Sequence, residues 1–403
     1  MKAIVYFGPG DIRLEEMRDP DLEAASDAIV RLTASAICGF DLQIARGSVP
    51  QMRPGTILGH EAVGVIEDLG EDIRNFEIGD RVLLCPTLAC GACRQCRRGH
   101  YAHCTRANPN GPSFGAAMFG GPAPSGPFHG LQAEYARVPF AHTTLLHLPE
   151  SLSDADGLAL TDAIPTGLFA IRLTQLRPGQ SLAVFGCGPV GQQAIAFAQR
   201  IGAGRIFAID RLASRLEAAR ARGAEAIDLE REDPVEVIDR LTQGEGVDCV
   251  IDAVPIDALP SRLSAPTELD GNSHRQRNGT TRDRLLPLLE TLRSAELPLT
   301  DASEQAFEWS CAVAGKSGTL AILCFQPGQV QRFSLASALQ KNLTLRLGTC
   351  HHRKYLPRLI EKSQTRRVQE HCYGSRALED EPLELLSMER SIEQRFFDLS
   401  PWE

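Results

Sequence analysis

Residues 181–191 read SLAVFGCGPVG and indicate the fold class more strongly than any other stretch of this chain. An apolar run leads into the glycine pattern G-x-G-x-x-G, and the helix-like sequence QQAIAFAQRIGA follows directly. Such glycines permit a tight turn and let backbone N–H groups approach a pyrophosphate at the helix N-terminus. Strand, turn and helix are the context that a dinucleotide-binding fingerprint requires. The loop residues that we assign to cofactor binding are Gly186, Gly188, Pro189, Val190 and Gly191.

A second strand-like run, Arg205–Ile209, ends at Asp210, 19 residues after Gly191. A carboxylate at this distance meets the adenosine ribose hydroxyls in this kind of unit and repels a 2′-phosphate, which favours NAD(H) over NADP(H). Arg211 and Arg215 leave the alternative open, because a nearby arginine can accommodate that phosphate. We prefer to interpret them as part of a solvated helix face, and we keep Arg215 as a cofactor-binding candidate.

The sequence beyond Asp210 continues to alternate between strand-like and helix-like segments. Such alternation predicts an α/β fold with a parallel, doubly wound sheet. Residues 255–300 interrupt the rhythm with polar and turn residues, so we interpret them as an insertion and not as a third domain. The helices are expected at 213–222, 234–242, 303–314 and 335–340, and the strands at 224–228, 248–253, 318–323 and 343–346.

Residues 37–61, ICGFDLQIARG…TILGHE, combine a thiol at Cys38 and an imidazole at His60 with carboxylates at Asp41 and Glu61. Thiolate and imidazole are ligand types that zinc favours, and a glycine beside each lets the backbone come close. The stretch therefore reads as half of a metal site. The alternative is a buried cysteine and a hydrogen-bonded histidine in a β-rich domain.

A second thiol cluster has the spacing C-x2-C-x2-C-x7-C. Four thiols spaced in this way can close around one tetrahedral ion and leave no position for a substrate, which predicts a structural zinc. An iron–sulfur cluster or four unpaired surface cysteines are the alternatives. His100 and His103 lie in the same lobe but are not needed as ligands. The four residues are Cys90, Cys93, Cys96 and Cys104.

The first 150 residues are rich in Gly and Pro, with short strand-like runs at 28–34, 62–68 and 81–85, as in a small irregular barrel. Residues 106–130 form a loop too long for a simple connector, and long loops in compact domains are often functional. We expect Phe119 and His129 to line a substrate pocket. A surface loop with incidental apolar residues is the alternative.

Composition excludes several classes of protein. The 403 residues carry a net charge of −9 without a basic stripe, which argues against nucleic acid as a partner. No apolar run approaches the ~20 residues that span a membrane, and the N-terminus lacks a signal-peptide core. Twelve cysteines without an export signal suggest reduced thiols and bound metal, so we expect a cytoplasmic protein.

The chain resembles the zinc-containing medium-chain alcohol dehydrogenases, and more narrowly the branch that includes glutathione-independent formaldehyde dehydrogenases and formaldehyde dismutases. The resemblance covers the chain from its start to about residue 360. It rests on six segments in a fixed order, and that order is more specific than any one of them. They are ICGFD, LGHE, the four-cysteine lobe, GLQAEY, TDAIPTG and AVFGCGPVG.

The resemblance implies the domain organisation. Residues 1–152 would form a GroES-like β-rich catalytic domain with a structural zinc lobe at 85–105. Residues 153–351 would form the Rossmann NAD-binding domain, in which Thr166 falls where the family approaches the nicotinamide. Residues 352–403 would return to the catalytic domain.

The resemblance also implies roles for the metal site. Cys38 and His60 match two ligands of the catalytic zinc, and Asp162 takes the position of the third. Three protein ligands leave the open fourth position of a catalytic zinc. Glu61 matches the acid behind the metal, which can exchange with the open-site ligand. Asp41 matches the carboxylate that steadies the ligating imidazole.

The chain departs from the family pattern at Phe40 and Gln43. The family usually carries Ser or Thr at the first position and a proton-relaying His at the second, and neither side chain found here can titrate at neutral pH. Phe40 also adds bulk beside the metal, so we include it in the substrate pocket. The stretch 365–388 matches the family poorly. Relatives usually form a final strand after a segment like FFDLSPWE, and we expect the return to the catalytic domain to lack that strand here.

Three functions remain open at this stage. The leading hypothesis is a zinc-dependent oxidoreductase, with two zinc ions per chain, that moves a hydride between NAD(H) and an alcohol/aldehyde or ketone pair. The second is an atypical reductase of a conjugated alkene or an iminium, or a dismutase, without the usual proton relay. The third is a catalytically silent nucleotide-binding protein. We also expect a small-molecule substrate and a homo-oligomer, either a dimer or a tetramer.

Overall fold

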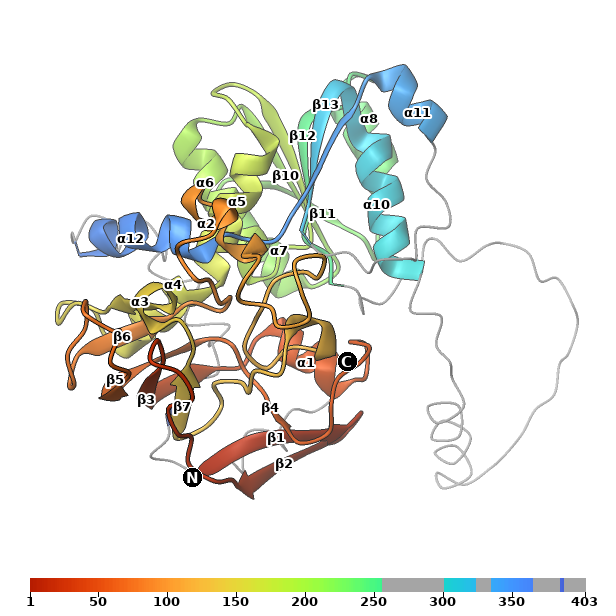
Figure 1. Cartoon of the computed structure of the whole chain (residues 1–403). Coiled ribbons are helices and arrows are strands. Elements are labelled where there is room, and N and C mark those ends of the chain that lie inside the picture. Colours follow the sequence, from red (N-terminus) through yellow and green to blue (C-terminus); the bar gives the residue numbers. More distant parts are fainter. Residues whose placement is uncertain (256–300, 324–334, 365–384, 388–403) are drawn as a thin grey trace, which may run out of the picture.

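The computed structural model describes residues 1–255, 301–323, 335–364 and 385–387, and the nucleotide domain forms its upper part in Figure 1. A six-stranded parallel sheet is the centre of this domain. Its strands, in spatial order, are β11 (Glu225–Asp228), β10 (Arg205–Asp210), β9 (Ser181–Phe185), β12 (Val247–Asp252), β13 (Ala314–Ile322) and β14 (Thr344–Leu347). Successive strands are added on one side of β9 up to β11 and on its other side from β12 to β14, so the strand order reverses between β9 and β12. Such a switch point is where parallel sheets of this kind bind ligands.

Helices cover both faces of this sheet. In β9, Leu182 and Val184 point to one hydrophobic cluster, and Ala183 and Phe185 point to the other. Strands covered on both faces read as nearly continuous apolar runs, as these do. The first face carries α5 (Ala163–Thr174), α6 (Pro189–Ile201) and α7 (Ala213–Ala221), the second carries α8 (Pro234–Leu241) and α10 (Asp301–Val313), and α11 (Leu335–Lys341) lies against β13. The parallel, doubly wound sheet predicted from the sequence is confirmed.

The part of the chain expected to form the catalytic domain is built from antiparallel strands in the lower part of Figure 1. The larger sheet contains β15 (Leu385–Ser387), β3 (Ala28–Ala36), β5 (Ala62–Leu69), β6 (Arg81–Leu84) and β8 (Leu145–His147), in that order, and β7 (Tyr135–Val138) also pairs with β3. The smaller sheet has the order β2 (Asp11–Glu16), β1 (Lys2–Gly8), β4 (Thr56–Ile57). Short helices punctuate the domain: α1 (Gly39–Ala45), α2 (Arg94–Arg97), η1 (Tyr101–His103), η2 (Ala123–Ser125) and α3 (Ala141–Thr144). The strands expected at 28–34, 62–68 and 81–85 are therefore present.

Two consecutive helices connect the domains. The first, α4 (Asp154–Thr161), packs on β3, β5 and β6 of the catalytic domain, and the second, α5, packs on α6 and on β12 and β13. Ser153 and Asp156 form a capping box that begins α4. Asp162 ends α4 and begins α5, with φ −129° and ψ −61°. Its side chain is therefore held at the boundary between the two domains.

The chain returns to the catalytic domain through α12 (His352–Ser363), which contacts α4, α5 and η1. Within this return the structure contains β15, which pairs antiparallel with β3 and precedes the segment after which relatives form their final strand. The pairing of Leu385 with Ala36 explains how so short a segment is held at the sheet edge. The predicted insertion at 255–300 lies outside the described residues except at its first position, and so does the FFDLSPWE segment.

Candidate metal and cofactor site

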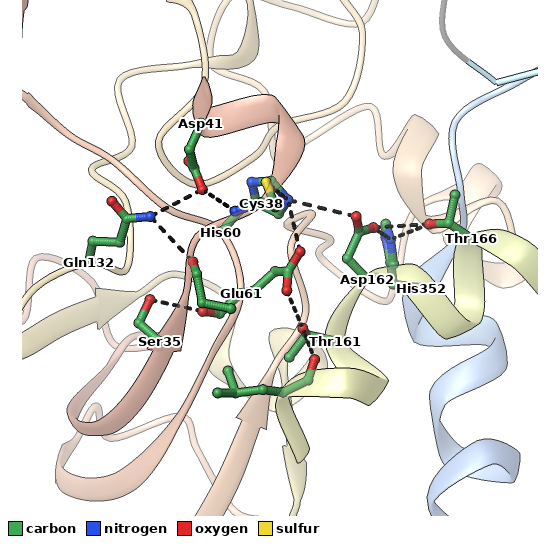
Figure 2. Close-up of polar contacts among 12 residues, drawn as sticks. Ser35, Cys38, Asp41, His60, Glu61, Gln132, Thr161, Asp162, Thr166 and His352 are labelled. Carbon is green, nitrogen blue, oxygen red and sulfur yellow. Dashed lines mark hydrogen bonds and ion pairs between the residues drawn. The ribbon is translucent and has the colours of Figure 1, made fainter. Parts of the chain in front are cut away.

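The N-terminus of α1 positions Cys38. The backbone N–H of Cys38 donates to Asp41 Oδ2 at 2.9 Å, which closes the first turn of the helix as a capping box. Gln132 donates to the same oxygen at 3.1 Å and to the carbonyl of Ala36 at 3.3 Å (Figure 2). Asp41 and Gln132 are each 2% exposed. These hydrogen bonds let Asp41 hold the backbone of Cys38 in place. The resemblance implied instead that Asp41 steadies the ligating imidazole.

His60 lies at the centre of the candidate site (Figure 2). Its Nε2 is 3.6 Å from Cys38 Sγ, 3.9 Å from Asp162 Oδ2 and 3.9 Å from Glu61 Oε1. Possible ligand atoms lie within 4.8 Å of one another in two groups that share His60, one with Cys38 and Asp41 and one with Glu61 and Asp162. His60 thus links the other two predicted ligands, Cys38 and Asp162, which belong to different groups.

The donor types and the two distances measured from His60 suit a zinc ion. Zinc bonds of ~2.0–2.3 Å in a tetrahedron place neighbouring ligand atoms roughly 3.4–3.6 Å apart, close to the two distances measured from His60. The donor set is a thiol, an imidazole and a carboxylate, which is the mixture that zinc accepts. The Asp162 side chain keeps 26% of its surface exposed while that of His60 keeps 7%, so the site is open on the side of the aspartate. An open side is what a catalytic metal requires.

Burial and neighbouring charges shift the pKa values of these groups. Burial raises the pKa of the Cys38 thiol to about 12, and the nearby Asp41 carboxylate adds to the effect. Burial, followed by the charge of Asp162, raises the pKa of Glu61 to about 8. Burial opposes ionisation of Asp162, but hydrogen bonds from His352 and His60 outweigh it and hold its pKa well below its usual range. Burial thus favours the protonated forms of Cys38 and Glu61, and a cation bound beside them would favour their ionised forms.

His352, the first residue of α12, was not identified from the sequence. Its Nε2 is 2.8 Å from Asp162 Oδ1 and 3.4 Å from Thr166 Oγ1, and the Thr166 hydroxyl donates to the same Oδ1 at 3.0 Å (Figure 2). Burial would lower the pKa of His352, but the attraction of Cys350 and the bond to Asp162 raise it to about 10. The sequence HHRKYLP carries no motif that would have linked this histidine to Asp162.

The four-cysteine lobe is a closed cluster. All four Sγ atoms lie within 4.8 Å of one another and all four residues are buried. Cys93 Sγ is 3.4 Å from Cys96 Sγ, too far for a disulfide and suitable for a shared ion. Burial raises the pKa of Cys93, but backbone N–H groups directed at its sulfur outweigh this and lower the pKa to about 5. A thiolate at this position suits a structural metal.

The glycine-rich loop has the geometry of a phosphate-binding turn. Gly186 has φ +83°, which favours glycine. A Cβ on Gly191 would lie 2.0 Å from the carbonyl oxygen of Gly186, so this position cannot carry a side chain. Pro189 is the first residue of α6, so the helix N-terminus faces the loop.

Asp210 is bound to this loop from the end of β10. Its Oδ2 accepts from Cys187 N at 2.7 Å, and its Oδ1 accepts from Arg211 N at 2.7 Å and Leu212 N at 2.9 Å. The Arg215 guanidinium is 3.8 Å from the same carboxylate. Arg211 pairs with Glu230 at 3.7 Å and so is turned to another partner.

The residues expected at the substrate pocket lie in different places. The Phe40 ring meets the His60 ring edge-on, with centroids 5.9 Å apart, and Gln43 is 5% exposed inside the domain. Phe119 is 1% exposed in the core of the catalytic domain. His129 Nδ1 accepts from Ile57 N at 3.2 Å and borders a cavity of about 160 Å³ formed with the 53–56 segment. Of the three expected pocket residues, Phe40 is the one in contact with the metal-site cluster.

Comparisons with known proteins decide the family. The model of the alcohol dehydrogenase GroES-like domain matches residues 24–150, and that of the zinc-binding dehydrogenases matches residues 189–267. A zinc-type alcohol dehydrogenase-like protein of Bacillus subtilis, AdhB, is 32% identical over 372 residues, which cover 91% of this chain and 90% of that protein. The chain belongs to the zinc-containing medium-chain alcohol dehydrogenases. This dehydrogenase is a zinc-dependent oxidoreductase with a nicotinamide cofactor, as the leading hypothesis predicted.

Two further proteins are similar to this dehydrogenase. The alcohol dehydrogenase TADH from Thermus sp. ATN1 has a similar solved structure, with a TM-score of 0.72, 31% identity and coverage of 92% of this chain and 91% of that one. A glutathione-independent formaldehyde dehydrogenase of Pseudomonas aeruginosa is 33% identical over 270 residues, covering 64% of this chain and 66% of that protein. Across the residues that the structure describes, none of the helices has the length and apolarity to cross a membrane.

Proposed function

We propose that this enzyme transfers a hydride between NAD(H) and a small-molecule alcohol/aldehyde or ketone pair, at a zinc held by Cys38, His60 and Asp162. The observation that carries the proposal is the position of His60 Nε2, 3.6 Å from a thiol and 3.9 Å from a carboxylate. When bound, zinc polarises the substrate oxygen, and NAD(H) accepts or donates the hydride.

The residues of this site have distinct tasks in the proposal. Asp41 and Gln132 fix the first turn of α1, so the Cys38 thiol keeps its direction. The Thr161 hydroxyl donates to Glu61 Oε2 at 3.4 Å, and Glu61 Oε1 lies 3.9 Å from His60 Nε2. In the proposal, Glu61 can therefore exchange with the ligand in the open position of the metal. Thr166 stands one turn after Asp162 on α5, on the side from which the nicotinamide would approach. Placing both reactants at this domain boundary would supply the proximity that hydride transfer needs.

The proposal also assigns two zinc ions per chain, the second held by the four thiols of the lobe. Metal analysis of the purified chain tests it: we expect two zinc ions and NAD-linked oxidation of at least one alcohol in a panel. A single zinc per chain that stays bound when Cys38 is replaced by Ala would overturn the catalytic site.

We further propose that NAD(H) is the preferred nicotinamide cofactor. The Asp210 carboxylate is 6% exposed and already engages three backbone N–H groups, so a 2′-phosphate placed beside it would meet a fixed negative charge. We expect kcat/KM to be higher with NAD⁺ than with NADP⁺. Equal values would show that Arg215 compensates for the repulsion.

A second candidate function keeps the fold and cofactor but changes the substrate to a conjugated alkene or an iminium, or makes the enzyme a dismutase. The observation that favours it is the Phe40 ring against His60, together with buried Gln43 where the family has a proton-relaying His. The double variant Phe40→Ser, Gln43→His tests it. A large gain in alcohol oxidation, with every native activity retained, would count against this alternative.

We also propose that the enzyme is a homo-oligomer. Three leucines near the β14 edge of the nucleotide sheet are exposed: Leu335 by 69%, Leu339 by 78% and Leu347 by 59%. Exposed apolar side chains that gather in one region often mark a protein contact. Sedimentation should give a dimer or tetramer, and Leu339→Glu should shift it toward smaller species. A monomeric wild type would contradict the proposal.

A further inference from the structure

Three side chains close a small hydrogen-bonded triangle at the domain boundary (Figure 2). His352 Nε2 is 2.8 Å from Asp162 Oδ1, Thr166 Oγ1 is 3.0 Å from the same oxygen, and the imidazole and the hydroxyl are 3.4 Å apart. Asp162 Oδ2 is the oxygen that faces His60 Nε2, at 3.9 Å. The two oxygens of one carboxylate are therefore used in different ways.

The direction of these bonds follows from the charge of Asp162. An ionised carboxylate can only accept hydrogen bonds, so both His352 Nε2 and the Thr166 hydroxyl donate to Oδ1. His352 is 4% exposed, and among the described residues its Nδ1 has no hydrogen-bond partner. The imidazole is thus oriented by the bond at Nε2, and that bond is charge-assisted.

The helix that carries His352 is held from its other side by the four-cysteine lobe. The ring of His351 stacks on His100 and meets His103 edge-on, both with centroids 5.3 Å apart. It also contacts the ring of Phe169 on α5. The position of His352 is therefore fixed by contacts that do not involve Asp162.

We propose that His352 is a positioning residue that holds Asp162 Oδ1, so that Oδ2 alone is presented to the metal beside His60. The inference rests on the function proposed above and adds to it a residue 190 positions away from Asp162 in the sequence. It assigns to the C-terminal return of the chain a part in forming the metal site, beyond closing the catalytic domain.

The chemistry of a carboxylate ligand explains why such a contact matters. A free aspartate can rotate about its side chain and offer either oxygen or both, and each unfixed arrangement weakens a tetrahedral site. A donor fixed on Oδ1 removes these alternatives before the metal arrives. Partners of this kind typically change metal affinity or activity by ~10–100-fold when they are removed.

Two substitutions at His352 and two elsewhere test the proposal. His352→Leu removes the donor and keeps much of the volume, whereas His352→Gln places an amide N–H near the position of Nε2. Thr166→Val removes the second donor to Oδ1. His351→Phe is the matched control, because a phenyl ring can keep the packing against His100, His103 and Phe169 and leaves the hydrogen bonds to Asp162 untouched.

Each purified variant is dialysed against a chelator, and zinc per chain is measured over time with thermal unfolding alongside. We expect His352→Leu to lose one zinc 10–100-fold faster than wild type and to keep the second. His352→Gln should restore slow release to within a few-fold, and Thr166→Val should fall between the two. Cobalt in place of zinc should show an altered visible spectrum in His352→Leu and a spectrum like wild type in His351→Phe.

The outcomes separate this inference from the function on which it rests. A wild type with one zinc overturns both. A wild type with two zincs and NAD-linked activity, combined with unchanged release from His352→Leu, overturns the inference alone. Loss of both zincs with a lower unfolding temperature in His352→Leu, and no rescue by His352→Gln, shows a merely structural residue and also overturns it.

Discussion

The four thiols of the lobe come from one short stretch, Cys90–Cys104, whereas Cys38, His60 and Asp162 come from three segments of the chain. In the lobe, backbone N–H groups of the same stretch reach the sulfurs, as Cys90 N does to Cys104 Sγ at 3.3 Å. In the open site, the supporting bonds cross from other elements: Gln132 to Asp41, and His352 to Asp162.

The difference shows what each cluster depends on. The lobe forms wherever its own stretch is folded, and its ligands leave no position for substrate. The open site exists only when α1, the α4–α5 junction and α12 are placed together, so its geometry reports on the whole domain boundary. Mutations in the open site should therefore lower activity, whereas mutations in the lobe should lower stability.

Cys38→Ala removes a ligand of the open site and should have the greatest consequence for activity. Loss of Lewis-acid assistance amounts to several kcal/mol, on the order of 10³-fold in kcat/KM. Zinc should fall from two ions per chain to one, with little change in unfolding temperature, because the lobe is untouched. Metal analysis and steady-state kinetics check this, and an active variant with one zinc would remove Cys38 from the mechanism.

Cys104→Ser should produce the opposite pattern in the lobe. Structural zinc contributes directly to folding, and a loss of a few kcal/mol lowers the unfolding temperature by about 10 °C in domains of this size. The molecules that remain folded should keep most of their activity per open-site zinc. Calorimetry with parallel activity assays measures both effects. If activity fell in proportion to the zinc lost from the lobe while stability stayed constant, the lobe would not have a purely structural role.

Asp41→Ala tests the hydrogen bonds through which Asp41 holds the backbone of Cys38. The substitution removes the acceptor of the Cys38 N–H and one of the two acceptors of the Gln132 amide, and each buried donor left unpaired costs about 1–3 kcal/mol. We expect a 10–100-fold lower zinc affinity at the open site. Asp41→Asn keeps an acceptor oxygen and should be much milder. If both variants behaved alike, the charge of Asp41 and not its hydrogen bonds would be responsible.

His351 lies where the two regions meet and gives a smaller, pH-dependent effect. Burial and the neighbouring rings of His103 and His100 lower its pKa to about 4, while an unfolded histidine has a pKa near 6.5. The unfolded chain therefore binds more protons between these values, and stability falls as the pH falls from about 6.5 to 4.

The variant His351→Phe cannot take up that proton. Its unfolding temperature should fall less than that of wild type between pH 7 and pH 5, by a few degrees, at equal measured zinc content. If the unfolding temperatures of both proteins fell equally between pH 7 and pH 5, another titrating group would be responsible for the loss of stability in acid.

Local patterns explain how much of this molecule could be predicted from its sequence. The loop with Gly186 and Gly191 and the spacing of the four cysteines each lie within one short stretch, so both were identified. Asp162 needed the resemblance to a family, because its partners are far away in the chain. Gln132 and His352 were missed, since a hydrogen bond formed between distant segments leaves no periodicity or spacing to read.

The hydrogen bonds that Asp41 Oδ2 accepts were also not predicted. Both an imidazole and a backbone N–H can donate to a carboxylate, and the sequence does not distinguish between them. The choice is made by α1, whose first turn brings the N–H of Cys38 to 2.9 Å from Oδ2. The start of helix α1 thus determines that the Cys38 N–H donates to Asp41 Oδ2.

The carboxylate of Asp210 has a consequence for protein engineering. The same side chain that would distinguish NAD(H) from NADP(H) also ties the end of β10 to Cys187, inside the glycine-rich loop. A designer who replaces it to admit a phosphorylated cofactor also removes the restraint on the turn that receives the pyrophosphate. A switch of coenzyme in this enzyme therefore calls for a second substitution that anchors the loop anew, and libraries that vary position 210 alone should yield weak binders of both coenzymes.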